Sequence, residues 1–181
     1  MSKRKVRLVI LCEDLQQEVF ARTFFLNCGF ERRKIISRPY PAGKGAGDQW
    51  VLGHYLQEVQ EYRRRSSEAV CLAVIIDADP AQTVPQRLTQ FDQLLASDGR
   101  QRRQPAERIA IFVPKRNIET WIHYLMGTAV EEESAYPKFS HREGDCKPHV
   151  EKLVHEICPI GLPGDAPSSV LAACQELQRI L

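Results

Sequence analysis

The sequence predicts an α/β fold in which helices cover both faces of a parallel or mostly parallel sheet, followed by a C-terminal helical extension. Strand-length apolar runs alternate with segments of helical periodicity along most of the chain. The apolar runs are nearly continuous, which is typical of strands buried on both faces of a parallel sheet. The chain has 181 residues, of which 43% are hydrophobic and 27% charged, a size and composition that suit one soluble domain with a single core.

Four segments have the composition and length of buried strands, and we expect strands at 6–12, 34–37, 69–76 and 108–113. The run AVCLAVII at 69–76 is the most hydrophobic in the chain, so we expect it in the middle of the sheet. The first run is too short for a signal peptide and is stopped directly by Glu13 and Asp14, so it is predicted to be a strand.

Apolar residues recur at helical spacing after each predicted strand, and we expect helices at 15–28, 49–65, 84–96 and 118–126. Asp48 and Asn117 precede two of these segments and are suitable N-cap residues. Gly29 and Gly127 are suitable C-terminal stops. The order of strands and helices therefore favours a parallel sheet built from β-α units.

The character of the sequence changes after residue 127. A polar stretch at 131–145 is predicted to be a long loop, a short helix is predicted at 147–157, and a last helix from Ser168 or Ser169 to Leu181. We expect residues 1–127 to form the α/β domain, and 128–181 to form a loop and helical extension of the same domain.

The overall charge is nearly balanced, with 25 Lys and Arg against 23 Asp and Glu and a formal net charge of +2. This balance excludes a histone-like polycation, but it does not exclude nucleic-acid binding, which depends on where the basic residues lie. No apolar stretch approaches the ~20 residues needed to span a bilayer, so no membrane association is expected. The six cysteines accompany no secretory signal and form no CxxC pair, which predicts reduced thiols in a cytoplasmic protein.

Acidic residues follow two of the predicted strands. Glu13 comes after the first strand, and Asp77 and Asp79 come after the third. In open α/β sheets the reacting groups lie at the carboxyl ends of the strands, so these three carboxylates are expected to meet. Carboxylates this close repel one another unless a cation neutralises them, and oxygen ligands suit Mg²⁺ or Mn²⁺. The alternative is that these residues only cap helices or face solvent.

Basic residues are also expected near this edge. Lys115 and Arg116 follow the fourth strand, where they could stabilise developing charge or bind a phosphate backbone. Lys44 lies in the glycine-rich stretch at 42–48, which lacks the spacing of a P-loop. Its backbone N–H groups could approach a phosphate, or the stretch could be a flexible loop.

Three segments together resemble the Toprim domain, in the small stand-alone version of the OLD-like (overcoming lysogenization defect) nucleases. They are LCEDLQQEVF at 11–20, IIDAD at 75–79 and FVPKRNIETW at 112–121. The resemblance covers roughly residues 5–126 and implies a Rossmann-like sheet. It also implies that Glu13, Asp77 and Asp79 are metal ligands or general base, with Glu119 as a further acidic group at the metal.

The resemblance implies a Mg²⁺-dependent nuclease, with DNA in preference to RNA as its substrate. Similar small proteins act beside ATPases in bacterial anti-phage defence, and this sequence has no Walker motif, so a separate ATPase subunit is expected. Two positions depart from the family pattern: Asp14 stands where the family has glycine, and Gln17 stands where it has an acid. These departures leave open a catalytically degenerate binding or scaffold subunit. A small-molecule phosphoryl-transfer enzyme is a third possibility.

Overall fold

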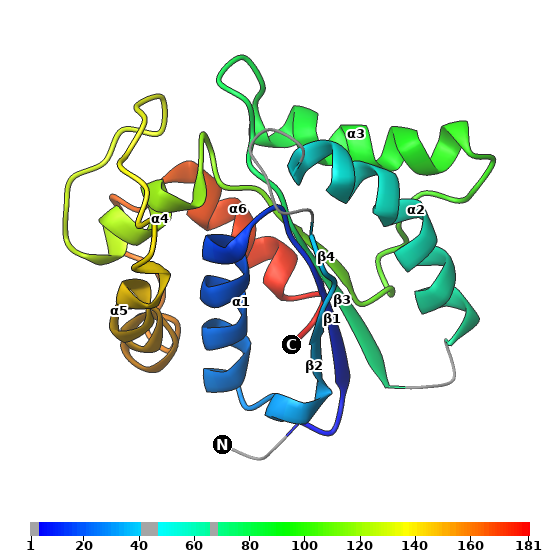
Figure 1. Ribbon diagram of the computed structural model, residues 1–181, viewed down its shortest axis with the longest axis horizontal. Helices are drawn as coiled ribbons and strands as arrows, with labels where there is room; N and C mark the ends of the chain where they lie inside the picture. The colour runs from blue at the N-terminus through cyan, green and yellow to red at the C-terminus, as the bar shows by residue number, and fades with distance from the viewer. Residues whose placement is uncertain (1–3, 41–46, 66–68) are drawn as a thin grey trace.

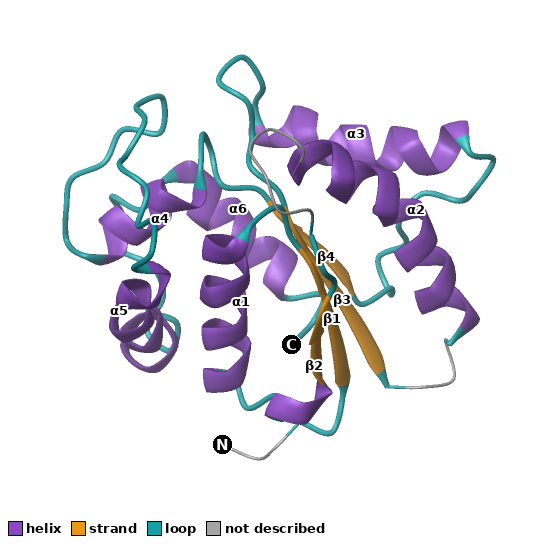
Figure 2. Ribbon diagram, viewed as in Figure 1, coloured by secondary structure: helices purple, strands orange, loops and turns teal. Residues whose placement is uncertain are grey.

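The computed structural model describes residues 4–40, 47–65 and 69–181. At its centre is a sheet of four strands, β1 (Arg7–Leu11), β2 (Ile35–Ser37), β3 (Val70–Ile75) and β4 (Ile109–Phe112). The strand order is β2-β1-β3-β4 and every neighbouring pair is parallel. The predicted α/β fold with a parallel sheet is therefore confirmed, and β3 lies inside the sheet as expected from its apolar sequence (Figures 1 and 2).

Helices cover both faces of the sheet. They are α1 (Leu15–Asn27), α2 (Gly47–Arg64), α3 (Val84–Ser97), α4 (Ile118–Leu125), α5 (Lys147–Lys152) and α6 (Ser168–Leu177). Buried side chains of α2 and α3 pack on one face, and those of α1, α4, α5 and α6 pack on the other. Figure 2 shows α2 and α3 together on one side of the strands and α1, α4 and α5 on the opposite side.

The side chains of β1 illustrate why the strands are apolar throughout. Leu8 and Ile10 pack on the α1 face, whereas Val9 and Leu11 pack on the α2 face. Successive strand residues point to opposite faces, so a strand covered on both sides needs apolar residues at every position.

The C-terminal segment completes the core and covers the outer edge of β4. Leu177 of α6 is buried in the same core as α1, and the Glu176 carboxylate accepts the N–H of Ile111 in β4 at 2.9 Å. Arg103 also pairs with Glu176. A side chain that occupies the free N–H of an edge strand protects that edge from pairing with another chain. The predicted C-terminal helices are thus present, and they pack against the α/β part of the chain.

Several element boundaries differ from those predicted. α2 begins at Gly47 rather than Gln49, so Asp48 lies in its first turn and is not its N-cap. β2 begins at Ile35 because Arg32–Lys34 form a short 3₁₀ turn (η1). The helix predicted at 147–157 changes at Leu153 into a π-helical turn, η3 (Leu153–Ile157). Asn117 precedes α4 as predicted, but its amide oxygen accepts from the Thr120 hydroxyl and not from a backbone N–H.

Within the described ranges, no helix combines the length and the apolar character that a membrane crossing requires. All six cysteines fall in these ranges, and all are free thiols.

Candidate metal centre

Glu13 and Asp77 meet at the carboxyl edge of the sheet. β1 and β3 are parallel neighbours, with Leu11 in register with Val74, and each acid lies two residues beyond the end of its strand. The Asp77 backbone N–H donates to Glu13 Oε1 at 2.7 Å. Residues 64 positions apart in the sequence are therefore in direct contact, as their positions after the two strands predict.

Gln17 connects the two acids through its side-chain amide. Its Nε2 donates to Asp77 Oδ1 at 2.9 Å, and its Oε1 accepts the backbone N–H of Glu13 at 2.9 Å. Gln17 is fully buried in the first turn of α1. The N-cap residue Asp14 fixes this turn, because its carboxylate accepts the Gln17 backbone N–H at 3.0 Å. Asp14 and Gln17, the two residues that depart from the Toprim pattern, thus hold Glu13 and Asp77 in place through hydrogen bonds.

Arg87 of α3 fixes the backbone at Asp77. Its guanidinium is only 3% exposed, and Nε and Nη2 donate to the Asp77 backbone carbonyl at 3.0 and 2.8 Å. Nη1 donates to Gln90 Oε1 at 2.9 Å. A buried charge satisfied by fixed acceptors positions its partners rigidly. Sequence reasoning missed Arg87, since it lies inside the helix predicted at 84–96 and belongs to no motif.

The electrostatics of the site favour a cation. Burial raises the pKa of Glu13 to about 7; the N–H of Asp77 and the charge of Arg87 oppose this effect, whereas Asp14 and Asp48 add to it. Burial also raises the pKa of Asp77 well above its ordinary value, and the charges of Glu13, Asp14 and Glu119 raise it further. Carboxyl groups held in this way regain their usual acidity when a cation neutralises them.

The available oxygens suit a divalent metal ion of the Mg²⁺ type. No described residue donates a hydrogen bond to Glu13 Oε2 or Asp77 Oδ2, while the other oxygen of each carboxylate is fixed. Mg²⁺ is commonly held by one or two carboxylates and keeps several waters or substrate phosphate oxygens as its other ligands. Over the described part of the chain, no three His, Cys, Asp or Glu side chains are grouped to hold a metal, so the protein offers this pair and not a closed cage.

The other predicted acidic residues make no hydrogen bond to the pair. The Asp79 side chain is 70% exposed, and its Oδ2 lies 4.0 Å from Arg87 Nη2. Glu119 is buried in the first turn of α4, where burial raises its pKa, and its charge acts on Asp77 without a hydrogen bond between them. Their roles as ligands remain predictions.

The predicted basic residues have different environments. Lys115 is buried, and its ammonium donates to the carbonyls of Pro80 and Gln82 at 3.1 and 2.9 Å, which ties down the loop after Asp79. Arg116 follows it with a φ of 71°, a left-handed conformation that is costly for a residue with a side chain. Lys44 lies outside the described residues. Lys138, which the sequence did not mark, places its exposed ammonium 3.9 Å from Asp14 Oδ2.

The first residue of α2 packs directly on Glu13. A Cβ atom added to Gly47 would lie 2.8 Å from Glu13 Cβ and 3.0 Å from its carbonyl oxygen. Only glycine allows this approach of α2 to the end of β1 without a shift of the backbone.

We therefore expect Gly47→Ala to lower the free energy of unfolding by about 1–3 kcal/mol through overpacking. Gly53→Ala in the same helix is the matched control, because a Cβ there meets no atom within 4 Å. That control should raise the free energy of unfolding by about 0.5–1 kcal/mol. Urea denaturation of both variants checks the pair, and equal effects would contradict the close contact.

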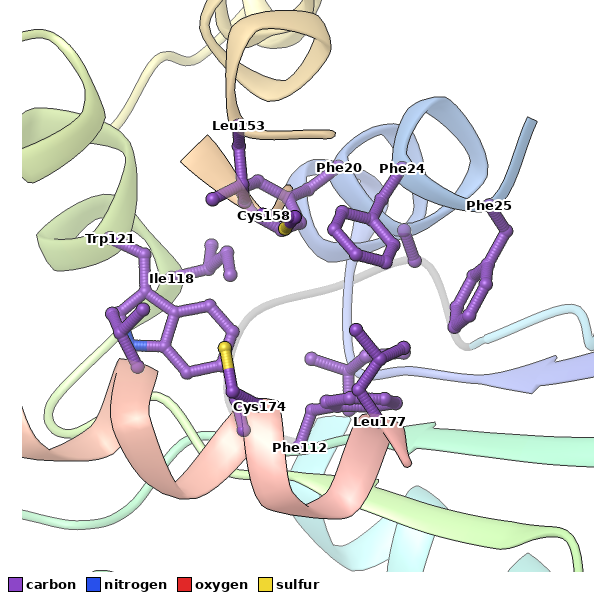
Figure 3. Close-up of a pocket in the computed structure, with 14 residues that line it drawn as sticks. Phe20, Phe24, Phe25, Phe112, Ile118, Trp121, Leu153, Cys158, Cys174 and Leu177 are labelled. Atoms are coloured by element: carbon purple, nitrogen blue, oxygen red, sulfur yellow. The ribbon is translucent and has the colours of Figure 1, made fainter. Parts of the chain in front are cut away.

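A cavity elsewhere in the fold is apolar, in contrast to the acidic Glu13–Asp77 pair. It has a volume of about 60 Å³ and lies between α1, α4, η3, α6 and the sheet (Figure 3). Its lining is apolar apart from the Trp121 indole N–H, which donates to Ser169 Oγ at 2.7 Å, and the thiols of Cys158 and Cys174. Burial raises the pKa of both thiols, which lowers their thiolate fraction. The described residues that line this cavity therefore include no carboxylate or imidazole of the kind found at the Glu13–Asp77 pair.

Comparison of the chain with protein-family models, curated proteins and solved structures finds no match.

Proposed function

We propose that this chain is a Toprim-like, Mg²⁺- or Mn²⁺-dependent nuclease that hydrolyses phosphodiester bonds at the Glu13–Asp77 pair. The observation that carries the proposal is the hydrogen bond from the Asp77 backbone N–H to the Glu13 carboxylate at the carboxyl edge of adjacent parallel strands. Each keeps one oxygen free of hydrogen bonds from the described residues. The pKa of each acid is raised, so a bound cation would stabilise both carboxylates in their charged form.

Our proposal assigns a separate role in binding or positioning to each residue of the site. Glu13 Oε2 and Asp77 Oδ2 hold the metal, which when bound would activate a water and stabilise the leaving oxygen. Gln17 fixes the orientation of Asp77, and Arg87 holds its backbone. Arg116 and the exposed Lys138 supply positive charge for the substrate phosphates near the pair.

The partners follow from the same proposal. The substrate is nucleic acid, DNA in preference to RNA, and a separate ATPase subunit acts with the chain in a bacterial anti-phage system. The protein works in the cytoplasm, where its six free thiols remain reduced.

Cleavage of supercoiled plasmid and of single-stranded DNA and RNA by the purified chain tests the proposal. We expect cleavage with Mg²⁺ or Mn²⁺ and none in EDTA. Absence of cleavage of all three substrates with both metals would overturn the nuclease proposal.

That negative result would favour the alternative, a Toprim-fold scaffold subunit without catalysis. One observation points in its direction: Gln17 occupies one oxygen of Asp77, and no third ligand is grouped with the pair among the described residues. A scaffold would bind its partner ATPase equally well after substitution of Asp77.

A further inference from the structure

A basic surface groove lies at the amino-terminal edge of the sheet, opposite the Glu13–Asp77 pair. It has a volume of about 430 Å³ and is lined by Lys5, Arg7, Arg33, Lys34, Ile36 and Ala69. β1 and β2 begin at the lower end of the sheet in Figure 1, whereas α1 begins at the upper end, shortly after Glu13. The groove and the candidate metal centre therefore occupy opposite ends of the strands.

Among the described residues, few carboxylates pair with the cations of this groove. None of the described residues that line it is acidic. Among the described residues, no carboxylate pairs with Lys5 or Arg7, and Lys34 donates to the backbone carbonyl of Lys5 at 2.9 Å. Arg33 pairs with Glu31 at 2.9 Å, but its side chain is 82% exposed, and such a pair contributes little to stability.

The neighbouring groove shows the contrast. It shares Arg7 with the basic groove, but its other arginines have carboxylate partners. Arg38 pairs with Glu58 at 2.6 Å, and Arg65 lies 3.6 Å from Glu61. Carboxylates of the protein thus pair with Arg38 and Arg65 there. At the basic groove, an external anion would take the equivalent place.

We propose that the basic groove binds the phosphodiester backbone of nucleic acid. Its four cations come from two separate chain segments and face one strip of surface, which suits a linear polyanion. Its apolar lining is limited to Ile36 and Ala69, so it offers few contacts for the side chains of an acidic peptide. None of the large exposed apolar side chains lines it, which disfavours a membrane surface.

Binding at this groove is independent of sequence and of the metal. Lysine and arginine contacts to phosphate fix position but do not read bases. Neither Glu13 nor Asp77 takes part, so this proposal can succeed or fail separately from the nuclease chemistry.

The test measures the affinity for a fluorescently labelled single-stranded DNA, and for its duplex, across a salt series in EDTA. All proteins carry Asp77→Asn, which excludes cleavage. The groove variant combines Lys5→Gln, Arg7→Gln and Arg33→Gln. The control variant removes the same charge from three exposed residues away from the groove, through Arg102→Gln, Lys147→Gln and Lys152→Gln.

We expect the groove variant to bind at least about tenfold more weakly at low salt. The slope of log affinity against log salt should fall in magnitude by about 2–3, because each lost cation removes about one phosphate contact. The control should retain the affinity and slope of the parent. Arg33→Gln alone, at an exposed position where folding is insensitive, should give a smaller loss in the same direction.

Equal losses in the groove and control variants would overturn the proposal, because net charge alone would then explain binding. Competition by poly-glutamate as effective as that by unlabelled DNA would also overturn it, since the groove would then recognise carboxylates as well as phosphates.

Discussion

Replacing Asp77 with asparagine is expected to lower the rate of metal-dependent cleavage by a factor on the order of 10³ or more. The change keeps the volume of the side chain, and its remaining oxygen can still accept from Gln17 Nε2, as Asp77 Oδ1 does now. It removes the negative charge and the free oxygen that we propose as a metal ligand. Metal-ion catalysis supplies several kcal/mol of transition-state stabilisation, and about 1.4 kcal/mol corresponds to tenfold in rate.

Asp165→Asn is the matched control for this variant. It makes the same chemical change at an exposed position whose charge does not act on Asp77, and it should leave cleavage unchanged. Single-turnover plasmid cleavage with Mg²⁺ or Mn²⁺ measures both variants. Full cleavage by Asp77→Asn would show that the reaction uses another site or a contaminating nuclease.

The second large effect is a dependence of stability on pH that originates at Glu13. Its pKa is about 7 in the folded protein and close to the ordinary value of 4.5 in the unfolded chain. Between these values the unfolded chain releases the proton while the folded protein keeps it, so the folded state loses stability as pH rises. The contribution of Glu13 to the free energy of unfolding should fall by about 3 kcal/mol from pH 4 to pH 8. Asp77 acts in the same direction, because its pKa is also raised.

Glu13→Gln removes this contribution, together with the part of the raised Asp77 pKa that the charge of Glu13 causes. The amide cannot ionise, but its oxygen can still accept the N–H of Asp77. Urea denaturation in EDTA across this pH range should show the variant gaining stability relative to wild type as pH rises. A constant difference between the two proteins would contradict the burial of Glu13 as the cause. The lowered pKa values of Glu107 and Glu132 act in the opposite sense in both proteins and cancel in the comparison.

The sequence predicts the sheet and the central contact of the site because both depend on patterns that tertiary packing preserves. Apolar runs of strand length can be satisfied only between two layers of helices. Parallel strands bring their carboxyl ends to one edge, so the acids at Glu13 and Asp77 had to lie near each other. The α/β fold confirms the first expectation, and the hydrogen bond between these residues is consistent with the second.

The positions of Arg87, Lys115 and Gly47 around the site could not be predicted from the sequence, because they depend on how the elements pack. Arg87 resembles any surface arginine of an amphipathic helix, and its burial depends on where α3 crosses the end of β3. Lys115 follows a strand as a phosphate-binding residue would, but its ammonium donates hydrogen bonds to the backbone carbonyls of two loop residues. Gly47 belongs to a glycine-rich stretch, and only the position of β1 distinguishes it from its neighbours. Gln17 could have been found from the sequence. It lies four residues after Glu13, a spacing at which side chains on one helical turn lie close together.

The most direct test of a metal shared by Glu13 and Asp77 is the anomalous diffraction of crystals soaked in Mn²⁺. We expect a peak within coordination distance of Glu13 Oε2 and Asp77 Oδ2, with water as the remaining ligands, and no such peak in crystals of Asp77→Asn. A wild-type crystal with no peak at this pair under saturating Mn²⁺, or with Mn²⁺ bound only elsewhere, would contradict it.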